Sequence, residues 1–131
     1  MKRIFLVCFL LTATCSMMIV EKTQAQITVP PTVTLADFTA KINLMDSYIA
    51  GGSMTLAQST WLDVHNMMLN VLATSKYSIN TAATPADRTA HIDILNNQRS
   101  IYRTVWLLKP DLATNRAAIH AALVNFGATI Y

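Results

Sequence analysis

Apolar residues recur at intervals of three and four along four segments of the chain, with polar residues between them. In an α-helix this spacing gathers the apolar side chains on one side, so each segment predicts an amphipathic helix. The first helix is expected to begin at Thr34, a capping residue with Asp37 three positions later, and to end at the Gly51–Gly52 pair. Its apolar stripe consists of Leu35, Phe38, Ile42, Met45 and Ile49.

The second helix is expected to begin near Thr55, where Gln58 would complete a Thr-x-x-Gln capping box, and to run to about Ser78. Its apolar and polar residues fall into opposite sectors, a separation that is typical of a helix packed on one side. The apolar sector consists of Trp61, Val64, Met68, Leu69, Val71 and Leu72, and the polar sector of Asp63, Asn66, Asn70 and Thr74.

The third helix has a well-marked start, because Thr84 can cap it, Pro85 fits its first turn and Asp87 follows three residues after the cap. It is expected to stop at Lys109, since Pro110 disfavours helical geometry in the residue before it. The expected inner stripe is Ala90, Ile94, Ile101, Val105 and Leu108.

The fourth helix is expected from about Asp111 to Phe126, with Gly127 at its end. Its expected buried residues are Leu112, Ile119, Leu123 and Phe126. Signals for β-strands are nearly absent. Four helices of about 16–24 residues, joined by short turns, run antiparallel to their neighbours. The sequence over 34–131 therefore predicts an all-α domain, an antiparallel up-down-up-down four-helix bundle.

Residues 1–25 have the order of a cleavable secretory signal peptide: a basic start, an uncharged stretch over 4–20, and small residues before the expected cleavage after Ala25. An extended leader with two adjacent prolines follows over 26–33. The main alternative is an uncleaved membrane anchor, because the apolar stretch is about as long as the shortest bilayer span. A weaker alternative is lipid attachment at Cys15, since the threonine before it fits such a signal poorly.

The charge and the cysteine content of the chain change when the predicted signal peptide is left out. The chain has ten basic and seven acidic residues, and the signal takes three basic residues and one acidic residue, which leaves seven basic and six acidic. A nearly neutral domain predicts neither a nucleic-acid partner nor a membrane-disrupting role. The predicted signal peptide implies an exported protein of periplasmic or extracellular location. Both cysteines lie in that signal peptide, so the mature protein is expected to have no disulfides.

The residue types that are missing exclude several kinds of site. Without cysteine the mature chain has no thiol nucleophile, iron–sulfur cluster or covalently attached haem, and without glutamate it lacks the carboxylates of a di-iron bundle. Three glycines do not form a phosphate-binding loop, and no Gly-x-Ser-x-Gly turn marks an activated serine. The sequence therefore predicts a protein that is not an enzyme.

His65 is the main candidate for a buried polar group, because it projects into the apolar sector of the second helix while Gln98 falls on the inner side of the third. A turn centred near residue 82 would place His65, Gln98, Arg99 and His120 at one level. A hydrogen bond from His65 to Gln98 that fixes the helix register is the preferred interpretation. The alternatives are a partly exposed His65 without a role, or ligation of a metal or haem by His65 with His120 or Met68. Two histidines without a carboxylate are an incomplete ligand set, so no metal site or cofactor is predicted.

Two further groups of residues have ordinary explanations. His91 lies four residues after Asp87, which predicts a surface contact between them, and Asp87 itself suits the first turn of a helix. Met45 and Met68 have core spacing and are expected to fill the interior.

Three large apolar residues are expected on the outside, where they form a candidate interaction surface: Met67, Ile92 and Leu107. The sequence thus favours an exported, non-enzymatic helical protein that binds an unknown protein partner or forms a homo-oligomer. The alternative function is a periplasmic haem- or metal-binding bundle. Contact with a membrane is not expected beyond the signal segment.

Overall fold

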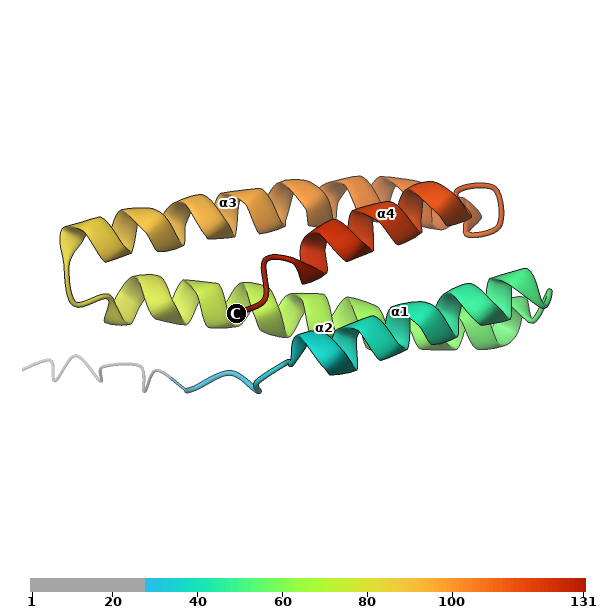
Figure 1. Ribbon diagram of the computed structural model, residues 1–131, viewed down its shortest axis with the longest axis horizontal. Helices are drawn as coiled ribbons and strands as arrows, with labels where there is room; N and C mark the ends of the chain where they lie inside the picture. The colour runs from blue at the N-terminus through green and yellow to red at the C-terminus, as the bar shows by residue number, and fades with distance from the viewer. Residues whose placement is uncertain (1–27) are drawn as a thin grey trace, which may run out of the picture.

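The computed structural model describes residues 28–131, so the predicted signal peptide and its cleavage point lie outside the described residues. Within them the chain is helical and contains no strand, which confirms the all-α prediction (Figure 1). The elements in order are α1 (Leu35–Ala50), α2 (Met54–Thr81), α3 (Pro85–Leu108), the 3-10 turn η1 (Lys109–Asp111) and α4 (Arg116–Gly127).

The starts of α1 and α3 are fixed by the two predicted threonine caps. The hydroxyl oxygen of Thr34 accepts the Asp37 N–H at 3.1 Å, while the hydroxyl donates to the Asp37 carboxylate at 2.6 Å. Thr84 and Asp87 repeat this arrangement at α3, with distances of 3.1 and 2.7 Å. Each pair satisfies a backbone N–H that has no partner within its helix, and it places an acid at the positive end of the helix dipole.

The boundaries of α2 differ from the prediction at both ends. The helix begins at Met54, and its capping residue Ser53 makes no side-chain hydrogen bond, so the predicted Thr55–Gln58 capping box is wrong. The turn before it is closed by the backbone, because Gly52 adopts a φ of 74° that favours glycine. At the other end α2 continues to Thr81, three residues beyond the predicted end, since no glycine or proline interrupts it.

The fourth helix is shorter than predicted. A 3-10 turn follows α3, and the Asp111 carboxylate accepts the Thr114 N–H at 2.9 Å. The Asn115 side chain donates to the carbonyl oxygen of Leu108 at 2.8 Å. These bonds hold a compact loop, so α4 begins only at Arg116.

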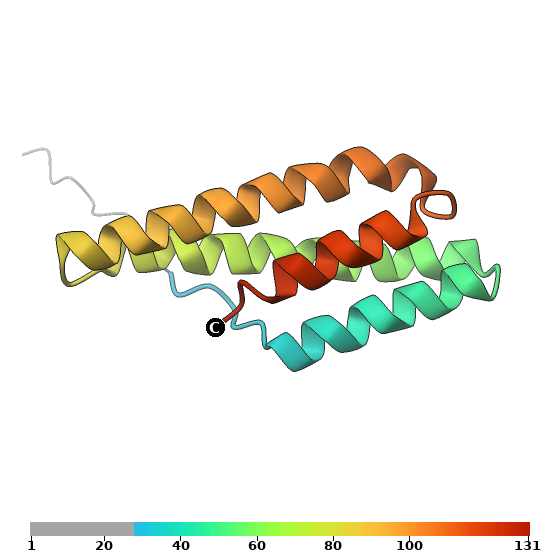
Figure 2. The same ribbon diagram turned by 45° about the horizontal axis from the view of Figure 1, so that its top comes forward.

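The helices lie lengthwise beside one another (Figures 1 and 2). Each packs against the next in the chain, and α1 also packs against α4, a pattern that fits a four-helix bundle. With 28 residues, α2 is about 42 Å long, whereas α4, with 12 residues, is about 18 Å long. The two shorter helices, α1 and α4, therefore cover only part of the α2–α3 hairpin, whose closed end extends beyond them.

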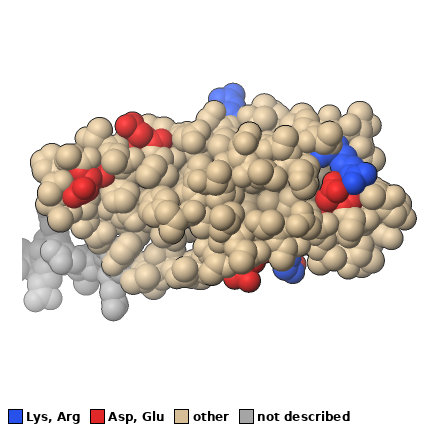
Figure 3. Space-filling view, in the orientation of Figure 1, with Lys and Arg blue, Asp and Glu red and all other residues tan. Residues whose placement is uncertain are grey.

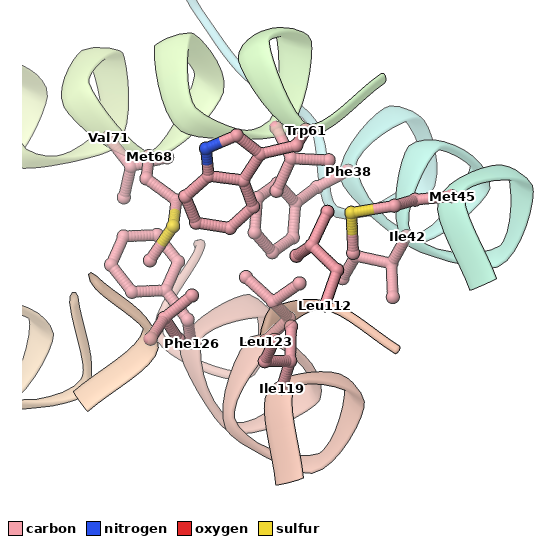
Figure 4. Close-up of a cluster of buried hydrophobic side chains, with 12 residues drawn as sticks. Phe38, Ile42, Met45, Trp61, Met68, Val71, Leu112, Ile119, Leu123 and Phe126 are labelled. Carbon is pink, nitrogen blue, oxygen red and sulfur yellow. The ribbon is translucent and has the colours of Figure 1, made fainter. Parts of the chain in front are cut away.

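The hydrophobic core lies where all four helices meet (Figure 4). Phe38 of α1 and Phe126 of α4 pack together with ring centroids 5.6 Å apart. Gly127 allows this close approach, because a Cβ atom there would lie 3.3 Å from the Phe38 ring. Met45 and Met68 are buried, as predicted. The core consists of Phe38, Ile42, Met45, Trp61, Val64, Met68, Val71, Val105, Leu112, Ile119, Leu123 and Phe126.

Several residues assigned to inner stripes lie outside. Leu35 is 49% exposed and Leu69 is 42% exposed, and Ala90 is exposed as well. On α3, Gln98 and Val105 are buried as predicted, and Leu95, which was not assigned to the inner side, is buried as well. Leu69 lies on a side of the α2–α3 hairpin that neither α1 nor α4 covers, and no other helix is present among residues 28–131.

Candidate interaction surface

His65 lies in an aromatic cluster between α2 and α3. Its ring centroid is 6.1 Å from that of Trp61 on the same helix, 5.8 Å from Tyr102 and 5.4 Å from Trp106. Tyr102 and Trp106 are stacked on each other at 6.3 Å. The Nδ1 atom of His65 is buried without a hydrogen-bond partner. The imidazole is therefore held by ring contacts, and it joins the two helices on their outer side.

The predicted hydrogen bond between His65 and Gln98 is wrong. Gln98 is fully buried and donates from Nε2 to the carbonyl oxygen of Thr129 at 3.4 Å, while its Oε1 has no partner. The turn between α2 and α3 lies over residues 82–84, close to the assumed centre. Gln98 points into the core, whereas His65 is only half-buried and meets α3 at Tyr102 and Trp106. Arg99, which was expected at the same level, is exposed.

His120 lies on a different side of the bundle from His65. It is half-buried on α4 and lines a hollow with Asp46 and Arg116, and its Nδ1 atom has no hydrogen-bond partner. Met68 is fully buried in the core. Residues 28–131 contain no group of three or more His, Cys, Asp or Glu side chains that could hold a metal ion. The structure thus does not bring the suggested metal or haem ligands together.

A bidentate ion pair links α4 to α1. Arg116 donates from Nε and Nη2 to the two carboxylate oxygens of Asp46, both at 2.6 Å. The hydrogen bonds and the charge of Arg116 lower the pKa of Asp46 below its ordinary value of 3.8, although partial burial opposes this effect. The positive charge of His120 adds to the lowering.

This shift predicts how the stability of the fold depends on pH. A carboxyl group with a lowered pKa stabilises the fold above its unfolded-state value, 3.8, and this contribution is lost as the pH falls through the folded-state value. Urea unfolding at pH 7 and below pH 3.8 should therefore show a smaller loss of stability on acidification for Asp46→Asn than for the wild type. Asp93→Asn, at an exposed position of α3, is the control, and its loss of stability on acidification should equal that of the wild type. Equal losses for all three proteins would contradict the prediction.

The predicted contact between His91 and Asp87 is not present. Asp87 is bound to the Thr84 cap, whereas His91 stacks on Tyr131 with ring centroids 6.3 Å apart. The Tyr131 hydroxyl lies 3.3 Å from Nδ1 of His91. His91 thus helps to dock the end of the chain on α3, which the helix spacing alone gave no reason to expect.

The three residues of the predicted interaction surface do not form one patch. Ile92 and Leu107 are exposed, as expected. Met67 is half-buried and packs against the core, so its predicted exposure is wrong. On α2 it lies about 160° around the helix from His65, because each residue turns the helix by about 100°.

A group of exposed apolar and aromatic side chains lies instead on the outer side of the hairpin. Leu62 is 59% exposed and lies three residues before His65, while Leu69 follows four residues after it. Across from them, Trp106 is 48% exposed and contacts His65. We call this surface the α2–α3 face and define it by Leu62, His65, Leu69, Tyr102 and Trp106.

Sequence reasoning missed Trp106 and assigned Leu69 to the core. The sequence did contain an indication of this surface, because Leu62, His65 and Leu69 form a separate stripe with helical spacing. Whether such a stripe faces the core or the solvent depends on which helices cover it, and the sequence did not provide that information.

No family model, curated protein or solved structure matches this chain. Within the part of the chain that the structure describes, no helix has the length and hydropathy needed to cross a membrane.

Proposed function

We propose that this chain is an exported, non-enzymatic helical protein that acts by binding another protein, or a second copy of itself, through the α2–α3 face. The observation that carries the proposal is Trp106, a large aromatic side chain that is half-exposed although ring contacts to His65 and Tyr102 hold it in place. Tryptophan and tyrosine are enriched among the residues that dominate binding energy at protein interfaces. A preordered aromatic side chain also loses little conformational freedom on binding.

Export and the direction of the helices belong to the same proposal. The basic start, apolar stretch and small residues of positions 1–25 support a signal peptide and a periplasmic or extracellular location. The colour progression along successive helices in Figure 1, together with the short turns between them, supports an antiparallel up-down-up-down bundle. In such a bundle the two long helices α2 and α3 form a continuous outer surface.

Association of the mature protein tests this proposal. The chain is expressed with its leader in the organism that produces it, and the solution mass and co-purifying proteins are measured. We expect a defined oligomer or one stoichiometric partner protein. Trp106→Ala should weaken this association by about tenfold or more, because truncation of a central interface tryptophan commonly costs about 2 kcal/mol or more.

Leu44→Ala is the matched control, since Leu44 is also an exposed apolar residue but lies on α1. It should leave the association unchanged, and circular dichroism should show that both variants are folded. A wild-type protein that is strictly monomeric and retains no partner would refute the proposal.

A further inference from the structure

The nearly neutral charge of the mature chain conceals an uneven distribution of its basic residues. Lys41 forms an ion pair with Asp63 at 2.7 Å, and Arg116 forms one with Asp46. These are the ion pairs found among the described residues, and on the face shown in Figure 3 blue and red atoms adjoin at the right and at the lower edge, while other charged groups stand apart. Within residues 28–131, the basic residues without an ion-pair partner among the described acids are Lys76, Arg88, Arg99, Arg103 and Lys109.

On α3 these basic residues follow the same side of the helix as Trp106. Arg88, Ile92, Arg99, Arg103 and Trp106 are separated by steps of four, seven, four and three residues, and all five are exposed. At about 100° per residue, these positions fall within a sector of about 60°. Three arginines and one isoleucine therefore extend the α2–α3 face along α3.

The other two unpaired cations border the same surface. Lys76 is exposed on α2 and follows Leu69 by seven residues, so it continues the stripe of Leu62, His65 and Leu69. The Lys109 ammonium lies 5.3 Å from the centre of the Trp106 ring, within the range of a cation–π contact.

The acidic residues of the hairpin and of η1 have other positions or partners. Asp63 binds Lys41 of α1, and Asp87 binds the Thr84 cap. Asp93 lies about 120° around α3 from Arg99. Asp111 of η1 accepts a hydrogen bond from the Thr114 backbone, and it lines a hollow with Leu62 and Lys109 at one end of the α2–α3 face. Apart from this one acid, the α2–α3 face is a row of apolar and aromatic side chains bordered by unpaired positive charges.

We infer that the partner of the α2–α3 face is an acidic protein segment, an amphipathic helix whose apolar residues pack on Trp106, Leu62 and Leu69 while its Asp and Glu side chains pair with the surrounding arginines. This inference rests on the proposed function and specifies the chemistry of its partner. The charge of the face complements such a segment and would repel a basic one. A second copy of this chain is a poorer match, because it would place the same positive charges opposite one another.

The composition of the face favours a protein partner over a lipid surface. Three of the five unpaired cations are arginines, whose planar guanidinium groups bind carboxylates through two parallel hydrogen bonds. The apolar side chains of the face are only about half exposed, so much of their surface is held within the protein and less remains to enter a bilayer. Tryptophan and arginine are also both enriched in protein interfaces.

The test uses synthetic helical peptides as probes. One peptide carries leucines along one side and glutamates beside them, and a second has glutamine in place of each glutamate. Binding to the mature protein is measured by calorimetry at low salt and at about 0.3 M salt. We expect the acidic peptide to bind at least tenfold more tightly than the glutamine peptide, and to lose most of this advantage at high salt, where charges are screened.

A double variant, Arg99→Gln with Arg103→Gln, should weaken binding of the acidic peptide by about tenfold or more and leave binding of the glutamine peptide unchanged. Arg116→Gln removes a cation from α4 and is the control, which should bind like the wild type because the carboxylate that it frees, Asp46, lies on α1 and not on the α2–α3 face. Both variants alter exposed or half-exposed side chains, so the fold should persist, as circular dichroism will verify.

Other outcomes overturn the inference in ways that can be told apart. Equal binding of both peptides, lost in Trp106→Ala, would refute an acidic partner and leave the proposed protein-binding function standing. Binding to anionic phospholipid vesicles without binding to either peptide would assign the face to a membrane instead. Absence of binding to every probe would refute the inference, whereas the association of the native protein would still test the proposed function separately.

Discussion

Phe126→Ala is expected to lower the free energy of unfolding by about 3–5 kcal/mol, the usual cost of truncating a buried phenylalanine. Phe126 is fully buried and packs on Phe38, so its loss leaves a cavity at the contact between α4 and α1. Small domains are stabilised by only about 5–15 kcal/mol, and α4 has few turns with which to compensate. The variant should therefore be close to unfolding at ambient temperature.

Urea unfolding followed by circular dichroism measures this effect. Leu107→Ala is the control, because Leu107 is also helical but 69% exposed, and its truncation should change the stability by less than about 0.5 kcal/mol. If both variants were equally stable, Phe126 would not be part of a packed core and the position of α4 would be wrong.

Gln98→Glu is expected to destabilise the fold by about 3–5 kcal/mol at pH 7, because it buries a charge without a partner. Gln98 is fully buried, and its Nε2 donates to the Thr129 carbonyl oxygen. A carboxylate there would face that carbonyl oxygen without a hydrogen to donate. Burial and this repulsion raise the pKa of the new carboxyl group in the folded state.

The sign of the pH dependence follows from this shift. Folding raises the pKa of this acid, so the folded state favours its protonated form. The stability of Gln98→Glu should therefore be close to that of the wild type at acidic pH and fall below it as the pH rises. Gln98→Met has nearly the same shape and no charge, and its stability relative to the wild type should not depend on pH. A Gln98→Glu variant as stable as the wild type at pH 7 would show that solvent reaches this position.

Gln98 also explains how the end of the chain is held. It borders a cavity of about 40 Å³ together with Ser75 of α2 and Ile130 near the C-terminus. The contact with Thr129 and the stacking of His91 on Tyr131 both dock residues after α4 onto α3. The C-terminal segment therefore covers part of the hairpin that α4 is too short to reach.

The sequence by itself determined the class of fold and most helix boundaries. Thr34 and Thr84 began their helices as predicted, because a cap is a local arrangement of four neighbouring residues. Phe38, Met45 and Met68 were correctly assigned to the core. Phe38 and Met68 lie near the centre of their apolar stripes, where most packing arrangements bury them, whereas Met45 lies at the edge of its stripe and is buried because α1 packs against both α2 and α4.

The tertiary structure alone decided the partner of His65, the shortening of α4 and the exposure of Leu69 and Trp106. Each depends on which helix lies opposite and at what register. The turn between α2 and α3 lay close to its expected place, yet Gln98 is buried in the core while His65 contacts the rings of α3. The Asp111 loop delayed the start of α4 to Arg116. Periodicity states which residues share a side of a helix, but only the packing of the other helices decides whether that side meets the core or the solvent.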